Sequence, residues 1–428
     1  MRIPELLSPA GGFEKMEYAL AYGADAVYAG IPRFSLRVRE NDFKTEKLYE
    51  AVEYVHQRNK KIYLTMNIYP HNRKVDSFIE ILDIVAQMNA DGLIMADPGM
   101  IAVAREKYPQ LNIHLSTQSN SINWQTVKFW KSIGLKRIIL SRELSIDEIA
   151  EIKQKAPDIE LETFIHGAVC IAYSGRCLLS NYFAHRDANQ GACTNACRWQ
   201  YRLYEGTERK TDDESEPYEY FLEETERPGQ LMPIDEDEHG TYIMNAKDLS
   251  AIHIINRLID AGIDSLKIEG RTKSLYYLSV ITGAYRKAID AWASGQKLSN
   301  EILDEVYAVA NRGYVTGFLE KNPLENGQNY LETHAAHPTH RFVGIVRSWD
   351  KNIKQAKIAV RNRFKAGDHL QLFNPESQIT FKVENIYSEA GETLEAAHGG
   401  GQDVYLPVNE NPGQYALLRK ITNYKTDW

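Results

Sequence analysis

Short β-rich runs alternate with amphipathic helical stretches along the first 165 residues, and one further pair follows near residue 265. The helical stretches carry apolar side chains at spacings of three and four, whereas the runs are short and apolar throughout. The expected strands are Glu5–Ser8, Ala26–Ala29, Lys61–Met66, Gly92–Ala96, Ile113–Thr117, Arg137–Ser141, Glu160–Ile165 and Ser265–Glu269. Eight strand–helix units predict an α/β fold whose parallel sheet closes into a (β/α)8 TIM-like barrel.

A Cys-bearing insertion separates the seventh and eighth expected strands. Its later part, about 200–240, is acidic: from Glu205 to Glu238 there are fourteen Asp and Glu against three Lys and Arg. This part has little periodicity, so we expect either a solvated surface loop or a lid beside the cysteines. Tyr242–Asn245 is a ninth strand candidate, which we expect to be accessory.

The chain changes character after the barrel, which is expected to span 1–295. A helical and turn-rich linker covers 296–340, and in 341–428 short apolar runs separated by Gly, Asn and Pro predict a small all-β barrel. Between Arg341 and Phe373 there are eight Lys and Arg and two acidic residues. RNA binding through phosphates is one hypothesis for this segment, and charged edge strands that prevent aggregation are the other.

The composition excludes several classes of protein. Charged residues make up 25% and hydrophobic residues 43% of the 428 residues, as in a globular protein with a large core. The sequence shows neither an apolar leader nor an apolar run of bilayer length, so we expect a cytoplasmic protein without membrane contact. With a formal net charge of −8, any nucleic-acid contact must come from a local patch.

All four cysteines lie within 28 residues directly after the seventh strand, with the spacing C-x6-C-x15-C-x3-C. They are Cys170, Cys177, Cys193 and Cys197. In a reducing compartment such a group indicates a metal site rather than disulfides. Structural zinc sites usually show two close cysteine pairs, and here only the last two cysteines are close. An iron–sulfur cluster is therefore favoured over zinc, and reduced or disulfide-linked cysteines are the remaining alternative.

Polar side chains recur just past the ends of the expected strands, which in a (β/α)8 barrel meet at one mouth. The candidates for catalysis are His166, Glu269 and Arg271, and those for substrate binding are Arg37, Asn67, Gln118, Asn120, Arg176 and Arg198; Asp97, Arg142 and Glu143 also lie at these ends. Arginines are suited to hold a carboxylate or to offset the charge of a cluster. Each candidate has a simpler alternative role in a loop hydrogen bond or a surface ion pair.

Several segments match a known family. ETFIHGAVCIAYSGRCLLSNY resembles the signature of the collagenase-like peptidase family U32, and PELLSPAGGFEKMEYALAYGADAVYAG resembles its N-terminal motif. IMNAKDL and SLKIEGR resemble later motifs of the same family. The resemblance covers nearly the whole chain, and HRDANQGACTNACRW is similar to the branch that is implicated in tRNA hydroxylation.

The resemblance implies a function. It implies oxygen-independent hydroxylation at carbon five of the wobble uridine in the tRNA anticodon loop, with prephenate as co-substrate. It also implies that the four cysteines hold a 4Fe-4S cluster; zinc stays the alternative metal from the spacing. The sequence does not decide whether the protein works alone, with a homologous partner or as a homo-oligomer. A peptidase and a zinc-stabilised binding protein are the other hypotheses. The sequence contains no H-E-x-x-H motif, which counts against a zinc protease.

Overall fold

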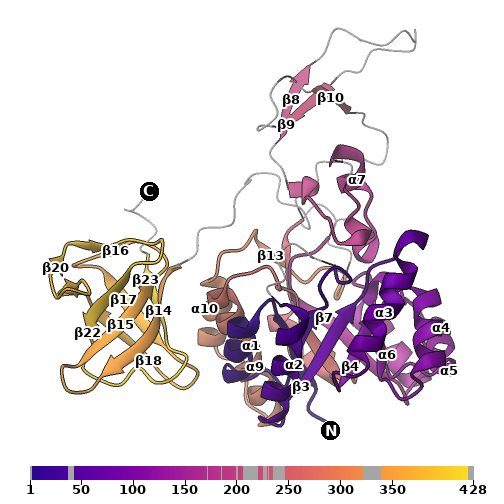
Figure 1. The fold of residues 1–428 in the computed structure, drawn as a ribbon, viewed down its shortest axis with the longest axis horizontal. Coiled ribbons are helices and arrows are strands. Elements are labelled where there is room, and N and C mark those ends of the chain that lie inside the picture. The colour runs from indigo at the N-terminus through magenta and orange to yellow at the C-terminus, as the bar shows by residue number, and fades with distance from the viewer. Residues whose placement is uncertain are drawn as a thin grey trace.

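The computed structural model describes residues 2–36, 43–170, 172–184, 186–198, 201–205, 220–224, 229, 231–234, 246–321 and 339–422. Figure 1 shows a barrel ringed by helices, a small sheet standing over one end of it, and a second β domain at its side. Within the described ranges no helix is long and apolar enough to cross a membrane.

Eight parallel strands close into the predicted barrel. They are β1 (Glu5–Ala10), β2 (Ala26–Gly30), β3 (Lys61–Met66), β4 (Gly92–Met95), β5 (Ile113–Leu115), β6 (Arg137–Ile139), β7 (Glu160–Gly167) and β12 (Ser265–Ile268). Neighbouring strands pair in chain order, and β12 pairs with both β7 and β1, which closes the ring. The strands are buried on both faces, as their nearly continuous apolar sequences require. The TIM-like fold is confirmed.

Helices cover the outside of the barrel because each of them has one apolar face. They are α1 (Phe13–Ala21), α2 (Thr45–His56), α3 (Val75–Val85), α4 (Pro98–Lys107), α5 (Trp124–Ser132), α6 (Ile146–Lys155), α8 (Ile255–Asp260) and α9 (Leu275–Ala293). At the start of α6, Ser145 and Glu148 form a capping box, in which each side chain binds the backbone N–H of the other residue.

The barrel sheet carries an additional edge beside β7. β11 (Asp248–Ser250) pairs antiparallel with β7, and β13 (Tyr314–Val315) pairs in parallel with β11. The expected accessory strand Tyr242–Asn245 lies outside the described residues, and β11 follows it closely in the chain. A strand of three residues is too short to show a periodic pattern in the sequence. Its formation depends on the strand with which it pairs.

The described helices and strands between β7 and β11 lie on the side of the barrel mouth (Figure 1). Four short helices carry or flank the cysteines: η4 (Tyr173–Gly175), α7 (Leu179–Ala184), η5 (Ala188–Gln190) and η6 (Ala196–Arg198). β8 (Tyr201–Glu205), β9 (Tyr220–Glu224) and β10 (Leu231–Ile234) form an antiparallel sheet with β9 in the middle. The acidic insertion thus contains regular structure, and most of its acidic residues lie outside the described part.

Residues 339–422 form the predicted small all-β domain. Its curved antiparallel sheet has the order β18–β17–β23–β14–β15–β22–β19–β20 around an apolar core of its own. The strands are β14 (His340–Asp350), β15 (Gln355–Val360), β16 (Phe364–Lys365), β17 (His369–Phe373), β18 (Gln378–Lys382), β19 (Ile386–Tyr387), β20 (Thr393–Leu394), β21 (Ala396–Ala397), β22 (Asp403–Pro407) and β23 (Leu417–Ile421). The short β16 and β21 pair with each other outside the main sheet.

The β domain packs against the barrel through a buried ion pair and aromatic rings. The Arg419 side chain is 1% exposed and donates hydrogen bonds of 2.8 and 2.6 Å to the two carboxylate oxygens of Glu305 in α10 (Asn300–Tyr307). The rings of Tyr22 and Phe373 meet edge to face with centroids 6.2 Å apart. A bidentate pair and packed rings hold the two domains in one orientation.

Candidate functional site

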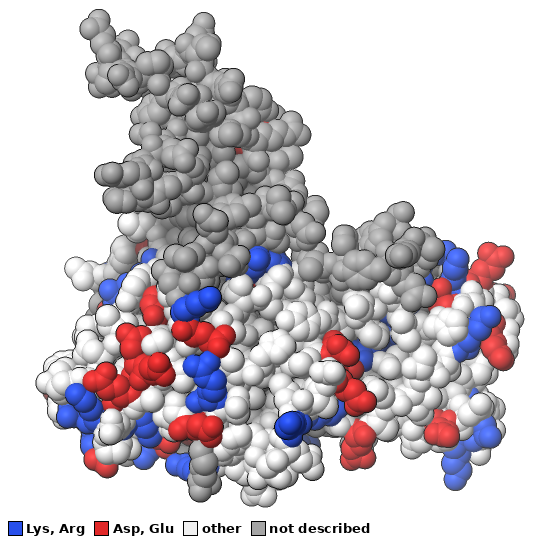
Figure 2. Space-filling view, turned by 180° about the vertical axis from the view of Figure 1, so that it is seen from behind, with Lys and Arg blue, Asp and Glu red and all other residues white. Residues whose placement is uncertain are grey.

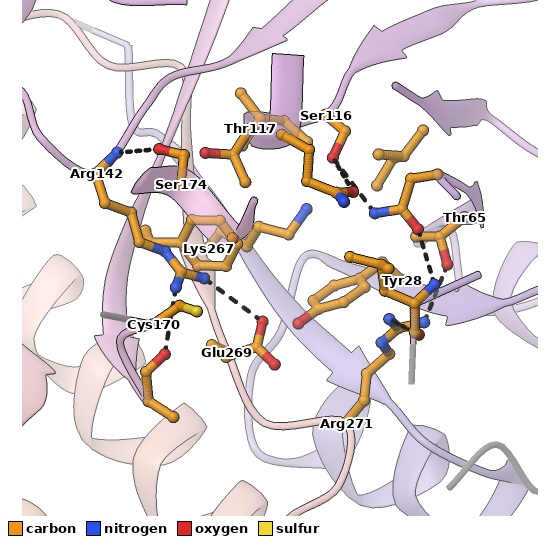
Figure 3. Close-up of a pocket in the computed structure, with 18 of the residues that line it drawn as sticks. Tyr28, Thr65, Ser116, Thr117, Arg142, Cys170, Ser174, Lys267, Glu269 and Arg271 are labelled. Carbon is orange, nitrogen blue, oxygen red and sulfur yellow. Dashed lines mark hydrogen bonds and ion pairs between the residues drawn. The ribbon is translucent and has the colours of Figure 1, made fainter. Parts of the chain in front are cut away.

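A cavity of about 130 Å³ opens at the carboxyl ends of the barrel strands, the end where this fold places its chemistry. Barrel strands and the loops after them form most of its lining, and the cysteine segment contributes further residues, of which Figure 3 labels Cys170 and Ser174 on the same side as Arg142. Its polar lining consists of Tyr28, Thr65, Asn67, Ser116, Thr117, Gln118, Arg142, Ser174, Lys267, Glu269 and Arg271, together with Cys170, Cys177 and Cys193.

A buried ion network forms the floor of this cavity. Lys267 from β12 and Glu162 from β7 are 4% and 0% exposed, and their Nζ and Oε1 atoms are 2.7 Å apart. The second carboxylate oxygen of Glu162 accepts a hydrogen bond of 3.0 Å from Arg137. Burial lowers the pKa of Lys267, and the Glu162 carboxylate opposes that shift. The Lys267 ammonium also lies 4.4 Å from the ring centre of Tyr28, so one amine is fixed below the cavity.

Arg271 is locked against the wall formed by β2 and β3. It donates from Nη1 to the Thr65 hydroxyl at 3.0 Å and from Nη2 to the Leu36 carbonyl (Figure 3). Gly30 lies against the guanidinium: a Cβ atom there would lie 2.5 Å from Oγ of Ser35 and 2.7 Å from Nη1 of Arg271, so a larger residue would force these side chains to shift. The sequence therefore reserves space in β2 for this guanidinium group.

Arg142 lies across the cavity from Arg271 in Figure 3. Its Nη1 donates to the Ala168 carbonyl at 3.3 Å, its Nη2 is 3.8 Å from Glu269, and its guanidinium stacks 4.0 Å from the ring centre of Phe164. Its Nε is buried and has no acceptor among the described residues. This arginine is positioned with one N–H still available to a ligand.

A chain of polar groups lines the adjoining wall. The Asn67 amide donates to the Ser116 hydroxyl at 3.3 Å and accepts from the Leu36 backbone N–H at 3.2 Å. The Ser116 hydroxyl donates to Oε1 of Gln118 at 3.4 Å, which leaves the buried Nε2 of Gln118 without an acceptor in the described structure. Buried donors are normally paired, so the two unpaired N–H groups indicate an acceptor such as a carboxylate.

The cysteine segment is tied to the barrel at two points. The Glu143 carboxylate, just past β6, accepts from the backbone N–H and the hydroxyl of Ser174 at 2.7 and 2.5 Å. Gly167 ends β7 with φ 108°, and a Cβ atom there would lie 2.5 Å from the Glu269 carbonyl. These contacts make the residues after β7 turn back over the mouth, which brings the cysteines to the cavity.

All four cysteines are thiols rather than disulfides in the structure. Cys170, Cys177 and Cys193 line the cavity. A hydrogen bond with Cys170, together with burial, raises the pKa of Cys177, and the charge of Cys197 acts in the same direction. Ser180 donates its hydroxyl to Sγ of Cys193 at 3.7 Å. The four thiols therefore belong to one neighbourhood.

This donor set is the type that an iron–sulfur cluster or zinc takes. Within the described ranges, no group of three or more His, Cys, Asp and Glu side chains lies close enough to hold a metal ion. The cysteines fit a metal group by chemistry and neighbourhood, and their convergence on one stays a prediction.

The structure brings several of the expected residues to the cavity and separates others from it. Asn67, Gln118, Glu269 and Arg271 line it, and Arg176 lies beside it with Nε 2.9 Å from the Gln118 carbonyl. Asn120 ends η3 (Thr117–Ser119) with φ 54° and does not line the cavity, and Asp97 caps α4. Arg37 and the side chain of Arg198 lie outside the described residues.

His166 lies behind the barrel wall rather than in the cavity. The register between β7 and β12 shifts between Phe164 and His166, and this bulge turns the imidazole away from the interior. The ring packs against Tyr277, Tyr285 and Tyr314, with Nδ1 3.3 Å from the Tyr285 hydroxyl. Burial lowers the pKa of His166 to about 3, so the ring is neutral at physiological pH.

Residues that point inward from strand interiors were not predicted from the sequence. Lys267, Tyr28 and Thr65 line the cavity, and Glu162 supports it from below. The signal for Lys267 was present, because it lies two residues before Glu269 and alternation places both on one face of the strand.

Comparisons with known proteins cover the whole chain. Residues 11–329 match Peptidase family U32, and residues 338–419 match the Peptidase family U32 C-terminal domain. tRNA hydroxylation protein P of Escherichia coli (strain K12) is 47% identical over 438 residues, which cover 97% of this chain and 96% of that protein. tRNA hydroxylation protein P of Haemophilus influenzae is 46% identical over 99% of this chain and 97% of that protein. tRNA hydroxylation protein P1 of Bacillus subtilis (strain 168) is 40% identical over 97% of this chain and 94% of that protein. With both of its domains matched in order, the chain belongs to peptidase family U32.

Proposed function

We propose that this chain is a tRNA-modifying enzyme that replaces the hydrogen on carbon five of the wobble uridine by a hydroxyl group. Three relatives that match nearly the whole chain carry the name tRNA hydroxylation protein. The observation that carries the proposal is the cavity at the barrel mouth, where thiols adjoin a positive wall. Its lining holds three cations (Arg142, Lys267, Arg271) and one carboxylate (Glu269), and Glu162 below the cavity pairs with Lys267.

The reaction needs a second reactant. Hydroxylation removes two electrons from the base and adds one oxygen atom, so without dioxygen another compound must supply that atom and balance the electrons. Prephenate, the co-substrate that the family resemblance implies, is a dicarboxylate whose two negative charges match the cavity. The unpaired N–H groups of Arg142 and Gln118 are suited to one carboxylate, and Arg271 and Lys267 provide the remaining positive charge.

The protein's own residues prepare this site. Tyr28 and Phe164 supply apolar walls that exclude water, and Thr65 and Leu36 prevent Arg271 from turning away. Glu269 is the one carboxylate of the described lining, and it is suited to exchange a proton with a reactant in the cavity. A 4Fe-4S cluster on the four cysteines would supply electron transfer beside the cavity.

The C-terminal domain is suited to hold the tRNA backbone. Figure 2 shows acidic and basic side chains interspersed on that face of the molecule, so a phosphate contact must be local. Arg361, Arg363 and Lys365 are exposed at alternate positions after β15, and no carboxylate of the described residues pairs with them. Figure 1 places β16, which contains Lys365, at the upper end of the domain, on the same side as the barrel mouth under α7.

The described lining of the cavity at the barrel mouth lacks the machinery of a peptidase, although His71 lines a neighbouring cleft together with Cys177. A cysteine protease needs a thiolate beside a histidine that acts as its base. None of the described residues that line the cavity is a histidine. His166, which precedes Cys170 by four residues, faces the tyrosines outside the barrel.

Two experiments test the proposal. Deleting the gene should remove 5-hydroxyuridine from tRNA nucleosides measured by mass spectrometry, and complementation should restore it; unchanged 5-hydroxyuridine in a strain without a paralogue would refute the proposal. In the purified protein, Arg142→Met should raise the KM for prephenate about tenfold or more, because a charge-assisted contact is lost. The exposed Arg257→Met is the matched control and should leave that KM unchanged.

A further inference from the structure

A second, open cleft of about 560 Å³ adjoins the cavity on the outer side of Cys177. Cys177 lines both spaces, so the cleft leads to the thiols from the solvent side. The remaining wall is formed by polar and aromatic side chains (Tyr69, His71, Arg176, Asp187, Asn189, Gln190) together with Pro70 and Leu178, and His71 lies 3.7 Å from the Asp187 carboxylate. Its size lies within the range of roughly 300–1,000 Å³ that small-molecule sites occupy.

An aromatic ring and a guanidinium group form one side of the cleft. Arg176 lies 5.1 Å from the centre of the Tyr69 ring and donates from Nη2 to the Tyr69 hydroxyl at 2.9 Å. Both side chains are anchored at the same place, because Nε of Arg176 and the Tyr69 hydroxyl each donate to the Gln118 carbonyl at 2.9 Å. Tyr69 is thus a rigid ring of the kind on which a nucleobase stacks, next to a charge suited to phosphate.

Two side-chain amides with an unpaired atom form the other side. The Asn189 amide donates from Nδ2 to the Cys177 carbonyl at 3.1 Å, which leaves its buried Oδ1 without a donor among the described residues. The Gln190 amide accepts from Lys74 at Oε1 at 3.0 Å, which leaves its buried Nε2 without an acceptor there. The bonded ends fix the orientation of each amide, so one buried acceptor and one buried donor of the residues that line the cleft remain without a partner among the described residues.

We propose that this cleft binds the target uracil, with its base-pairing edge on Asn189 and Gln190 and its face on Tyr69. Uracil offers an N3–H donor between two carbonyl acceptors, which is complementary to the unused acceptor of Asn189 and the unused donor of Gln190. With N3–H of uracil facing Asn189 and its O4 carbonyl facing Gln190, cytosine in the same orientation would place its N3 acceptor against the Asn189 acceptor and its amino donor against the Gln190 donor. Recognition through this edge leaves the C5–C6 edge of the base free to react.

The arrangement divides the two reactants between two spaces. The anionic co-substrate occupies the inner cavity and the base occupies the outer cleft, and Cys177 lies at the boundary that both share. The Arg176 side chain is exposed, so its guanidinium is accessible to the phosphate of the same nucleotide. This inference rests on the proposed tRNA hydroxylation and adds the residues that select the base.

Variants of the two walls test the inference. Gln190→Glu replaces the unused donor by an acceptor and should lower single-turnover hydroxylation of a uridine-containing anticodon stem–loop about tenfold or more. Tyr69→Leu should weaken binding of the same RNA, measured by fluorescence anisotropy, by about fivefold or more, whereas Tyr49→Leu, which changes an exposed ring that lines neither space, should bind like wild type. The KM for prephenate should not change in Gln190→Glu. A folding defect would instead impair both the hydroxylation of the RNA and the use of prephenate.

The outcomes separate this inference from the proposed function. If wild type hydroxylates the stem–loop and Tyr69→Leu and Gln190→Glu match it in binding and turnover, the base lies elsewhere and the inference is overturned. If wild type neither binds nor hydroxylates any tRNA, the proposed function itself fails. Replacing the target uridine by cytidine should weaken RNA binding to wild type, and equal binding of the two RNAs would also count against the assignment of the amides.

Discussion

The position of His166 leads to a prediction that separates a structural histidine from a catalytic one. Burial lowers its pKa to about 3 from an ordinary value of 6.5. Above pH 6.5 the ring is neutral in both the folded and the unfolded chain, and it contributes no pH dependence. As the pH falls from 6.5 towards 3, the unfolded chain binds a proton that the folded chain does not. The free energy of unfolding therefore falls with pH in this window.

The size of the effect follows from the shift. One pH unit inside the window corresponds to about 1.4 kcal/mol, so His166 should remove about 2 kcal/mol of stability between pH 7 and pH 5. His166→Gln removes the titrating ring, so this part of the loss of stability in acid should be absent. His114, whose pKa burial also lowers, acts in the same direction in both proteins and cancels in the comparison.

Urea unfolding followed by tryptophan fluorescence at both pH values measures the difference. The variant should also keep turnover within about threefold of wild type at pH 8, since the His166 ring that it replaces does not line the cavity. Two results would refute the reasoning. One is an equal loss of stability in wild type and variant between pH 7 and pH 5. The other is a loss of turnover of a hundredfold or so with an intact fold, which would make His166 the acid–base group after all.

Two further predictions concern the ion network and the basic segment. Glu162→Gln should lower the free energy of unfolding by about 3–5 kcal/mol, because it leaves the buried Lys267 ammonium without its carboxylate partner, whereas Lys267→Met should lower it by less than about 2 kcal/mol because Glu162 keeps Arg137. Equal losses in urea unfolding would contradict this asymmetry. Arg363→Glu should weaken tRNA binding several-fold and flatten its salt dependence. Lys354→Glu at the far end of β15, roughly 20 Å away, is the matched control and should bind like wild type; equal weakening would disprove the patch.

The barrel could be predicted because its elements are locally encoded. Each strand is a short apolar run followed by an amphipathic helix, and β3 was predicted at its observed bounds, Lys61–Met66. The capping box of Ser145 and Glu148 is equally local, since both partners lie within one turn of the chain. β11 could not be predicted, because three residues carry no pattern of their own and pair with β7 through contacts that are distant in sequence.

The candidate site could be predicted in part. Position after a strand identified Asn67, Gln118, Glu269 and Arg271, because parallel strands end at a common mouth. The same reasoning placed His166 there, and it failed because a β-bulge shifts the register by one residue and moves the side chain to the other face. Asp97 also satisfies the positional rule, but its carboxylate accepts the backbone N–H of Met100 and caps α4.

The cleft beside Cys177 could not be predicted from the sequence, for a different reason. Asn189 and Gln190 follow no strand, and their significance lies in which end of each amide is already bonded, to Cys177 and Lys74. The orientation of such an amide depends on contacts between distant segments: Lys74 and Gln190 are 116 positions apart in the chain. The spacing of residues in the sequence does not predict a contact of this kind.

The most direct test of the account is an anaerobic reaction with the purified, iron-loaded protein. An unmodified tRNA transcript and prephenate are added, and the tRNA is then digested to nucleosides that are separated and identified by mass spectrometry. The account predicts 5-hydroxyuridine at the wobble position, with none formed when prephenate is omitted or when Cys177 is replaced by alanine. Uridine that stays unmodified in the complete reaction, with a protein that is folded, carries its iron and binds the tRNA, would contradict it.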